Sequence, residues 1–221
     1  MQRSAVVLAR CVALVETYDL SPDGRVFYPD LVRELVSRYQ FQKFPKDFSQ
    51  IDEAKGVEFL EGKYGDDVIW NLTIYNMAIL LDTRSNTTRS REIVEEALEW
   101  GKATFGLKYE PGMIKRFGYV SQVTFYSDAT LDMLHPALKR LVKRVSDSVS
   151  NDHQEEIEYQ TTQVGIHHDH LKRKSALAGF TIAPRVETPL SDHKYFSEAP
   201  LQTDLHWELL EEFEAGLLSQ K

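Results

Sequence analysis

Three short segments with strand-type patterning limit most strongly what this chain can fold into. They cover residues 56–64, 67–75 and 78–83, and only Asn76 and Met77 separate the last two. A connection that short joins antiparallel strands, because parallel neighbours need a crossover of about a dozen residues or more. The last two segments therefore predict an antiparallel hairpin. One face of its first strand is expected to carry the apolar residues Val68, Trp70, Leu72 and Ile74.

Four segments predict helices, because apolar residues recur in them every three or four positions. They lie at 29–39, 90–105 and 131–149, with a last helix after Thr203. The buried side of the third helix is expected to carry Leu134, Leu138, Leu141, Val142 and Val145. The buried side of the last helix is expected to carry Leu205, Leu209, Phe213 and Leu217.

Turn and capping residues place some of these helix ends. Ser90 is the expected N-cap of the second helix, since its hydroxyl can accept a backbone hydrogen bond. Gly106 is expected to end that helix, because glycine adopts the left-handed conformation at little cost. Pro136 is expected in the first turn of the third helix, where its missing N–H does no harm.

Further strand-type patterns occur at 5–18, 117–126, 157–168 and 176–187, and a proline-containing loop is expected at 188–202. The first of these is a short apolar run, so a helix stays open as an alternative there. Strict alternation of strands and helices is absent, which disfavours a parallel doubly wound sheet. The sequence predicts an α+β fold with a mainly antiparallel sheet of about six to seven strands and three to four packed helices.

Length and composition favour one core. With 221 residues, of which 42% are hydrophobic, the chain can bury a sizeable interior. We expect a single α+β domain over residues 1–221, with the polar stretch 146–156 as the place for a subdomain boundary. The formal net charge of −8 argues against non-specific nucleic-acid binding over the whole surface.

The location of the protein is predicted from three features. No stretch approaches the roughly 20 apolar residues that a membrane-spanning helix needs, so no membrane association is expected. The apolar run near the N-terminus is interrupted by Arg10, and no signal-peptide cleavage site follows. The single cysteine, Cys11, cannot form an intrachain disulfide and fits a reducing compartment. A cytoplasmic location is therefore expected.

The familiar signatures of cofactor binding and nucleophilic catalysis are absent from the sequence. There is no Gly-x-x-x-x-Gly-Lys-Ser/Thr phosphate loop and no Gly-x-Gly-x-x-Gly dinucleotide loop. There is also no Gly-x-Ser-x-Gly nucleophile elbow, and one cysteine cannot make a Cys-x-x-Cys pair. We expect no cofactor, with a divalent metal ion as the remaining alternative.

The metal alternative rests on His167, His168 and His170. Imidazole is a good ligand for zinc and other transition metals, and on a strand His168 and His170 would point to the same face. A metal site normally needs three or four convergent ligands, so His153 or His193 would have to contribute as well. A solvated hairpin tip is the alternative that we favour.

A second hydrolase signal is the triplet Glu61-Gly62-Lys63 at the end of a predicted strand. It resembles the core of the PD-(D/E)xK nuclease pattern, in which carboxylates hold a divalent ion and the lysine helps position the attacking water. A match of only three residues is expected by chance in a charged chain. A salt-bridged strand end is the simpler interpretation.

Two groups of basic residues could bind anions. Lys139, Arg140, Lys143 and Arg144 form a stripe on the polar side of the third helix, where they could contact phosphate or an acidic protein surface. A solvated helix face is the favoured alternative, because such faces usually carry charge.

The second group consists of Arg84, Arg89 and Arg91, which gather before a predicted helix start. A helix N-terminus with arginines is a candidate anion site, although a plain polar loop explains the same residues.

The leading functional hypothesis is therefore a non-catalytic interaction or adaptor protein, such as a subunit of a larger assembly. Its expected partner is another protein or a second copy of the chain. An antiparallel sheet with charged helix faces suits recognition, and the motifs give no complete catalytic group. The alternatives are a metal-dependent, nuclease-like hydrolase and nucleic-acid contact through the basic helix.

Overall fold

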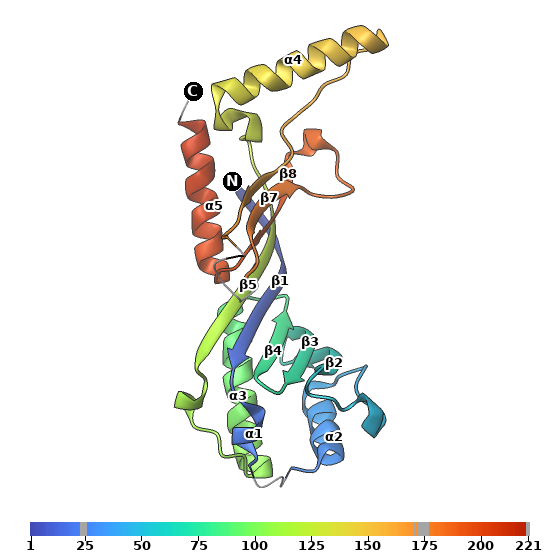
Figure 1. Cartoon of the computed structure of the whole chain (residues 1–221), viewed down its shortest axis with the longest axis vertical. Helices are drawn as coiled ribbons and strands as arrows, with labels where there is room; N and C mark the ends of the chain where they lie inside the picture. The colour runs from blue at the N-terminus through green and yellow to red at the C-terminus, as the bar shows by residue number, and fades with distance from the viewer. Residues whose placement is uncertain (23–25, 170, 172–176, 220–221) are drawn as a thin grey trace. The chain divides into compact units, whose positions relative to one another are not determined.

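A computed structural model describes residues 1–22, 26–169, 171 and 177–219. In these residues it shows one antiparallel sheet of eight strands in the order β2-β3-β4-β1-β5-β8-β7-β6, together with five α-helices (Figure 1). The predicted α+β class and the antiparallel sheet are confirmed. The sheet has slightly more strands than the six to seven expected, because residues 194–199 form a strand within the predicted loop.

The bounds of the elements are as follows. The strands are β1 (Gln2–Leu14), β2 (Val57–Tyr64), β3 (Asp67–Tyr75), β4 (Ala78–Thr83), β5 (Arg116–Tyr126), β6 (Val164–Ile166), β7 (Phe180–Pro184) and β8 (Lys194–Ala199). The helices are α1 (Thr17–Leu20), α2 (Tyr28–Tyr39), α3 (Thr87–Phe105), α4 (Pro136–His153) and α5 (Thr203–Leu218). The 3₁₀ turn η3 (Leu131–Leu134) precedes α4.

The chain divides into two compact units. The N-terminal unit comprises residues 6–121 and 200–203, and the C-terminal unit comprises 1–5 with the described parts of 122–199 and 204–219. Residues 146–156 lie inside the C-terminal unit, mostly in α4. The interpretation of the chain as a single domain stays a prediction.

The N-terminal unit has its core between the sheet and the helices α2 and α3. Strands β2, β3 and β4 follow one another as antiparallel neighbours, which confirms the predicted hairpin. The apolar stripe of α2 buries Val32, Leu35 and Tyr39. Cys11 is fully buried, and this burial raises the pKa of its thiol to about 12. The thiol therefore stays protonated and packs as a small apolar group.

The predicted facing of β3 is wrong for Val68 and Trp70 but not for the buried Leu72, because the strand contains an irregularity. The register with β4 shifts between Ile69 and Asn71, as it does at a β-bulge. An extra residue at such a point reverses which side chains face the core. Ile69 is consequently buried, whereas Val68 and Trp70 are exposed.

The start of α3 also differs from the prediction. Its N-cap is Asn86, whose side chain accepts a hydrogen bond from the Thr88 N–H, and the helix begins at Thr87. Ser90 is instead fully buried, and its hydroxyl donates to the Ala9 carbonyl oxygen at 2.8 Å. The end of α3 is as predicted, since Gly106 follows it with a φ of 69°.

Replacing Gly106 by alanine should lower the free energy of unfolding by about 1 kcal/mol, because an L-residue is strained at positive φ. Equilibrium urea denaturation would measure the change. The matched control is Gly112→Ala, since Gly112 has open space around it and no positive φ. Equal effects at the two positions would contradict the predicted role of Gly106.

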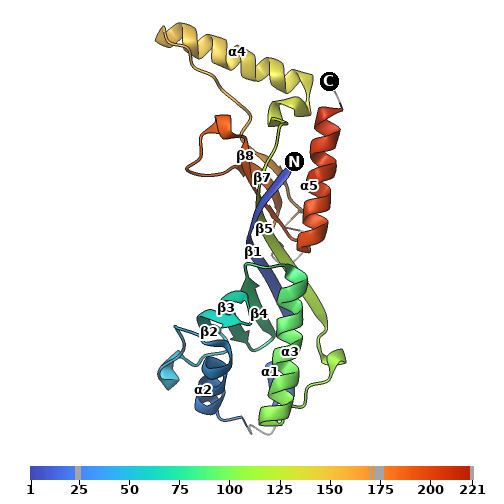
Figure 2. The same ribbon diagram turned by 180° about the vertical axis from the view of Figure 1, so that it is seen from behind.

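The C-terminal unit packs α5 against the strands β7 and β8 and the end of β5 (Figures 1 and 2). Alternate residues of β8 are buried, and Tyr195 of this strand stacks on Phe125 at 5.6 Å between ring centroids. The strand predicted over 157–168 is shorter than expected, because only Val164–Ile166 pairs with β7.

None of the helices in the described residues combines the length and the apolar character that crossing a lipid bilayer would require.

Candidate interaction surface

Helix α4 begins and ends with well-defined caps. The His135 side chain accepts a hydrogen bond from the Ala137 N–H at 3.1 Å, and Pro136 occupies the first helical position, as predicted. Gln154 ends the helix in the left-handed conformation. These caps define a helix of 18 residues, which is five turns long.

The burial predicted for α4 is wrong. The pattern of apolar residues is present, but none of the residues of α4 is buried. Leu141 is 58% exposed and Val145 is 37% exposed, while Leu138 and Val142 are partly covered. Figures 1 and 2 show the helix standing clear of the strands of its own unit. Its apolar stripe has therefore formed without a core to cover it.

One flank of α4 is covered by the chain that returns from it. The Ser150 hydroxyl bonds both backbone groups of Ile157, at 2.9 and 3.1 Å. The Ser146 hydroxyl accepts from the Tyr159 N–H at 2.9 Å. This segment lies along the serine side of the helix, which is rotated by about 100° or more around the helix axis from Leu141 and Val145. The two exposed residues remain on the open flank.

A row of arginines runs beside this open flank. Arg140 and Arg144 are four residues apart, and Arg144 follows Leu141 by three residues, so these three side chains are neighbours on the helix surface. Lys143 pairs with Asp147 at 3.2 Å, whereas neither arginine pairs with a carboxylate in the described part of the chain. The structure thus brings together the four basic residues predicted for this stripe, Lys139, Arg140, Lys143 and Arg144.

The outer face of α5 carries the opposite charge. Leu205 is 43% exposed and Leu209 is 36% exposed, although both were predicted to face inward. The core of the unit is filled instead by the adjacent stripe of the helix. That stripe consists of His206, Trp207, Leu210 and Glu214, together with Leu217, which is buried as predicted.

Two glutamates accompany the exposed leucines. Glu208 and Glu212 are exposed and four residues apart, the same spacing as the leucine pair. Glu211 is engaged within its own unit, where Arg3 pairs with it at 2.9 Å. The outer face of α5 therefore offers two apolar side chains beside two carboxylates, and α4 offers two apolar side chains beside two guanidinium groups.

The inner face of α5 contains a serine–histidine pair. The Ser197 hydroxyl and His206 Nε2 are 2.8 Å apart, a distance that would suit a nucleophile and its base. Both residues are fully buried, which closes the pair to substrate. Burial lowers the pKa of His206 to about 4, so the ring stays neutral at physiological pH. The pair holds β8 to α5.

The N-terminus is fixed to α5 by a buried carboxylate. Burial favours the neutral form of Glu214, but hydrogen bonds from the terminal amine and from the Ser127 hydroxyl hold its pKa below the usual value. Both donors belong to the C-terminal unit. The ionised Glu214 consequently fixes the first residue and the end of β5 to the helix.

Of the three arginines predicted at this helix start, only Arg84 precedes α3, and the three side chains do not converge on one point. Arg84 lies over the Trp70 ring at 4.1 Å from its centroid. Arg89 binds Asp67 at 2.7 Å, and Arg91 binds Glu95 at 3.0 Å. The anion site stays a prediction, with two of its three guanidinium groups already paired with carboxylates.

The predicted metal ligands lie partly outside the described residues. His170 is one of those not described, while His167 is exposed and lies against Gly165 and Gly179. Among the described residues, no group of three histidine, cysteine, aspartate or glutamate side chains could hold a metal ion. The metal site stays a prediction.

The nuclease-like triplet has a local partner. Glu61 forms an ion pair with Lys43 at 2.6 Å, and the Lys63 side chain is exposed on the same strand. This arrangement matches the salt-bridged strand end that was the simpler interpretation.

Comparison with known proteins gives no family for the chain: no protein-family model matches it, and no curated protein matches it in sequence. The functional interpretation therefore rests on the surfaces of the molecule itself. Of these, sequence reasoning identified the basic side of α4 but missed the acidic face of α5. The missed signal is the second apolar row, Leu205 and Leu209, on a helix that needs only one row for its core.

Proposed function

We propose that this protein is a non-catalytic interaction protein that works by self-association. The open flank of α4 binds the outer face of α5 in a second copy of the chain. The observation that carries the proposal is an amphipathic helix of 18 residues without a single buried residue. An apolar helix face normally packs against another element, and in the described residues this one leaves Leu141 and Val145 exposed.

Charge complementarity selects the occupant. The α4 of a second copy would place Arg140 and Arg144 against another pair of arginines. The α5 of a second copy instead offers Glu208 and Glu212 beside two exposed leucines. Like charges brought together across an interface cost several kcal/mol, whereas opposite charges set the register of the contact.

A two-fold arrangement would use each surface once per protomer. In a symmetric dimer, α4 of each copy meets α5 of the other, so the contact forms twice. Duplicated contacts double the apolar area removed from water, which helps a small patch reach the size of a stable interface.

The two exposed apolar residues favour a protein over a nucleic acid. Phosphate groups would engage the arginines but would leave Leu141 and Val145 in water. A protein surface with its own apolar residues satisfies both parts of the patch, and the outer face of α5 has both.

Charge reversal on α4 tests the proposal. Arg140→Glu together with Arg144→Glu should raise the Kd of self-association at least about tenfold, because two attractive contacts become repulsive. Sedimentation velocity over a wide concentration range would measure it. The matched control is Lys46→Glu with Lys63→Glu, which makes the same change in net charge at exposed sites of the N-terminal unit.

A mixing experiment makes the test specific. Glu208→Arg with Glu212→Arg should weaken self-association as strongly as the α4 variant does. An equimolar mixture of the two variants should form a heterodimer, because reversed α4 then meets reversed α5 and the unchanged surfaces also match. A wild-type chain that stays monomeric throughout, or a mixture that does not recover association, would overturn the proposal.

A further inference from the structure

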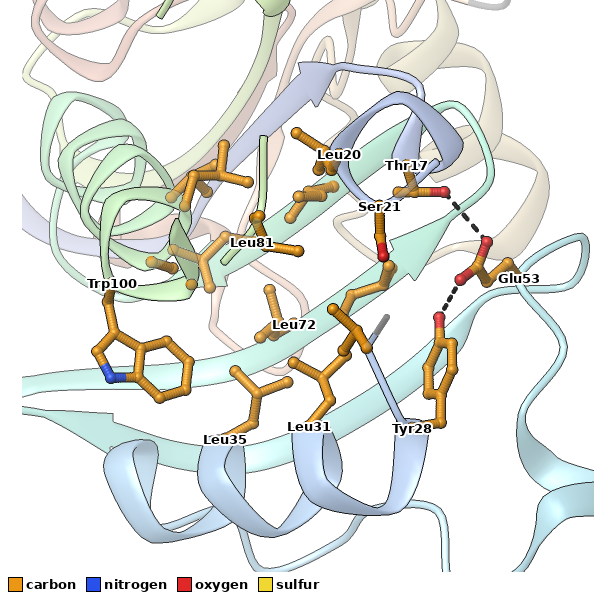
Figure 3. A pocket seen from close by; sticks show the side chains of 18 of the residues that line it. Thr17, Leu20, Ser21, Tyr28, Leu31, Leu35, Glu53, Leu72, Leu81 and Trp100 are labelled. Atoms are coloured by element: carbon orange, nitrogen blue, oxygen red, sulfur yellow. Dashed lines mark hydrogen bonds between the residues drawn. The ribbon is translucent and has the colours of Figure 1, made fainter. Parts of the chain in front are cut away.

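A large cavity interrupts the core of the N-terminal unit. It has a volume of about 410 Å³ and lies between α2, α3 and the strands β3 and β4, with α1 at one end (Figure 3). Protein cores are packed at nearly the density of organic crystals, with few voids larger than a water molecule. Pockets that bind small molecules have volumes of roughly 300–1,000 Å³. This cavity therefore has the size of a ligand site and is too large for a packing defect.

Most of the cavity wall is apolar. Leu31 and Leu35 of α2 face Leu72 and Leu81 of the sheet across the cavity, and Trp100 of α3 closes one side (Figure 3). No lysine, arginine or histidine is among the described residues that line it. The body of a ligand held here would consequently be uncharged and apolar.

One end of the cavity carries a carboxylate. Glu53 accepts hydrogen bonds from the Tyr28 hydroxyl and, at 3.1 Å, from the Thr17 hydroxyl. Figure 3 shows these three side chains together at the edge of the apolar wall. Burial and the neighbouring Glu53 raise the pKa of Tyr28, which keeps its hydroxyl protonated as a donor.

The carboxylate is held in place by uncharged donors. The backbone at Glu53 is held by Asn76, whose N–H donates to the Glu53 carbonyl oxygen at 3.1 Å. Each carboxylate oxygen accepts one hydroxyl and retains another lone pair for a further donor. No basic side chain pairs with Glu53 in the part of the chain that the structure describes. Glu53 is thus oriented to accept a donor, preferably a cationic one, from a ligand.

We propose that this cavity binds a small amphiphile that has an apolar body and a protonated amine head. The body lies among the leucines, and the ammonium group binds Glu53. A fatty acid with the same apolar body is excluded, because its carboxylate would meet that of Glu53 inside an apolar site.

Three probes with alkyl chains of the same length test the preference of the cavity for one head group. Isothermal titration calorimetry would compare n-octylamine, n-octanol and n-octanoate with the full chain at neutral pH. We expect octylamine to bind best and octanoate to show no binding. Glu53→Gln should weaken octylamine binding about tenfold or more while leaving octanol nearly unchanged, because it removes the charge but keeps an acceptor.

Filling the cavity tests the location. Ala97 lines it from α3, so Ala97→Leu should abolish binding of both octylamine and octanol. Ala103→Leu is the matched control, because residue 103 is on the exposed side of the same helix. Leu31→Trp is a second filling variant, and circular dichroism would establish that each variant is folded.

Three results would overturn the proposal. One is octanoate binding as tightly as octylamine, which would show that Glu53 does not select the head group. The second is octylamine binding that survives Ala97→Leu and Leu31→Trp in folded protein. The third is an absence of binding by all three probes.

Discussion

Between pH 6.5 and pH 4, His206 is expected to remove about 3 kcal/mol from the free energy of unfolding of this protein. The folded-state pKa is about 4, below the ordinary value of 6.5. The stabilisation is therefore fully present above pH 6.5, where both states are neutral. It is lost as the pH falls toward 4, because the unfolded chain takes up the proton first.

The cause of this pKa shift is burial. The His206 ring is fully buried, lies edge-on to Phe180 and near Trp207, and shares one hydrogen bond with Ser197. Its Nδ1 is buried without a hydrogen-bond partner in the described structure. A protonated ring would carry an N–H at that atom with no acceptor, in surroundings that cannot solvate the charge.

Comparison with a non-titrating variant isolates this effect. His206→Gln keeps a polar group that can bond to Ser197 but does not titrate. Urea denaturation at several pH values would give the difference in stability between wild type and variant. The contributions of carboxylates such as Glu214 are the same in both proteins and cancel in this difference. The difference should change by about 3 kcal/mol over this interval. A difference that is independent of pH would contradict the assignment.

Gly62→Ala is expected to lower the free energy of unfolding by about 1–3 kcal/mol through overpacking. A Cβ at position 62 would lie 2.5 Å from the Phe41 ring and 2.9 Å from the Tyr39 carbonyl oxygen. The ring cannot turn aside easily, because it packs against Phe59 at 5.5 Å between centroids and is buried. The backbone of β2 or the ring must shift.

Two further variants make this prediction specific. Gly118→Ala is the matched control, since Gly118 is also in a strand but its nearest neighbour to a new Cβ lies 3.9 Å away. The smaller side chain of Phe41→Leu should relieve the clash, so the double variant should lose less stability than the sum of the single ones. Strict additivity would show that the cost at position 62 does not come from the ring.

The local patterns of the sequence were sufficient for the elements formed by near neighbours. Helix α2, strand β3, strand β4 and the end of α3 at Gly106 occupy the predicted residues, because spacing and turn chemistry act within a few positions. Strand β8 (Lys194–Ala199) was not predicted. Prolines flank it, and its buried side carries serine and alanine as well as tyrosine, which is not a typical strand pattern. Its strand conformation comes from pairing with β7.

Which side chains of a strand or helix point toward the core could be determined only from the tertiary structure. A bulge in β3 turned Val68 and Trp70 outward, and the choice between two apolar rows on α5 left Leu205 and Leu209 exposed. Helix α4 has the periodicity of a core helix, yet none of its residues is fully buried. Periodicity states that a helix has an apolar face, but what covers that face depends on long-range packing.

The sequence by itself determined the class of fold, the charge of the α4 stripe and the position of most helices and strands, because these follow from local conformational preference and composition. Only the tertiary structure decided which apolar side chains stay exposed and where the core leaves a cavity. It placed Glu53, Tyr28 and Thr17, from three separate segments, at one end of an apolar cavity. It also left complementary faces of α4 and α5 in solvent, because burial depends on which distant residues meet.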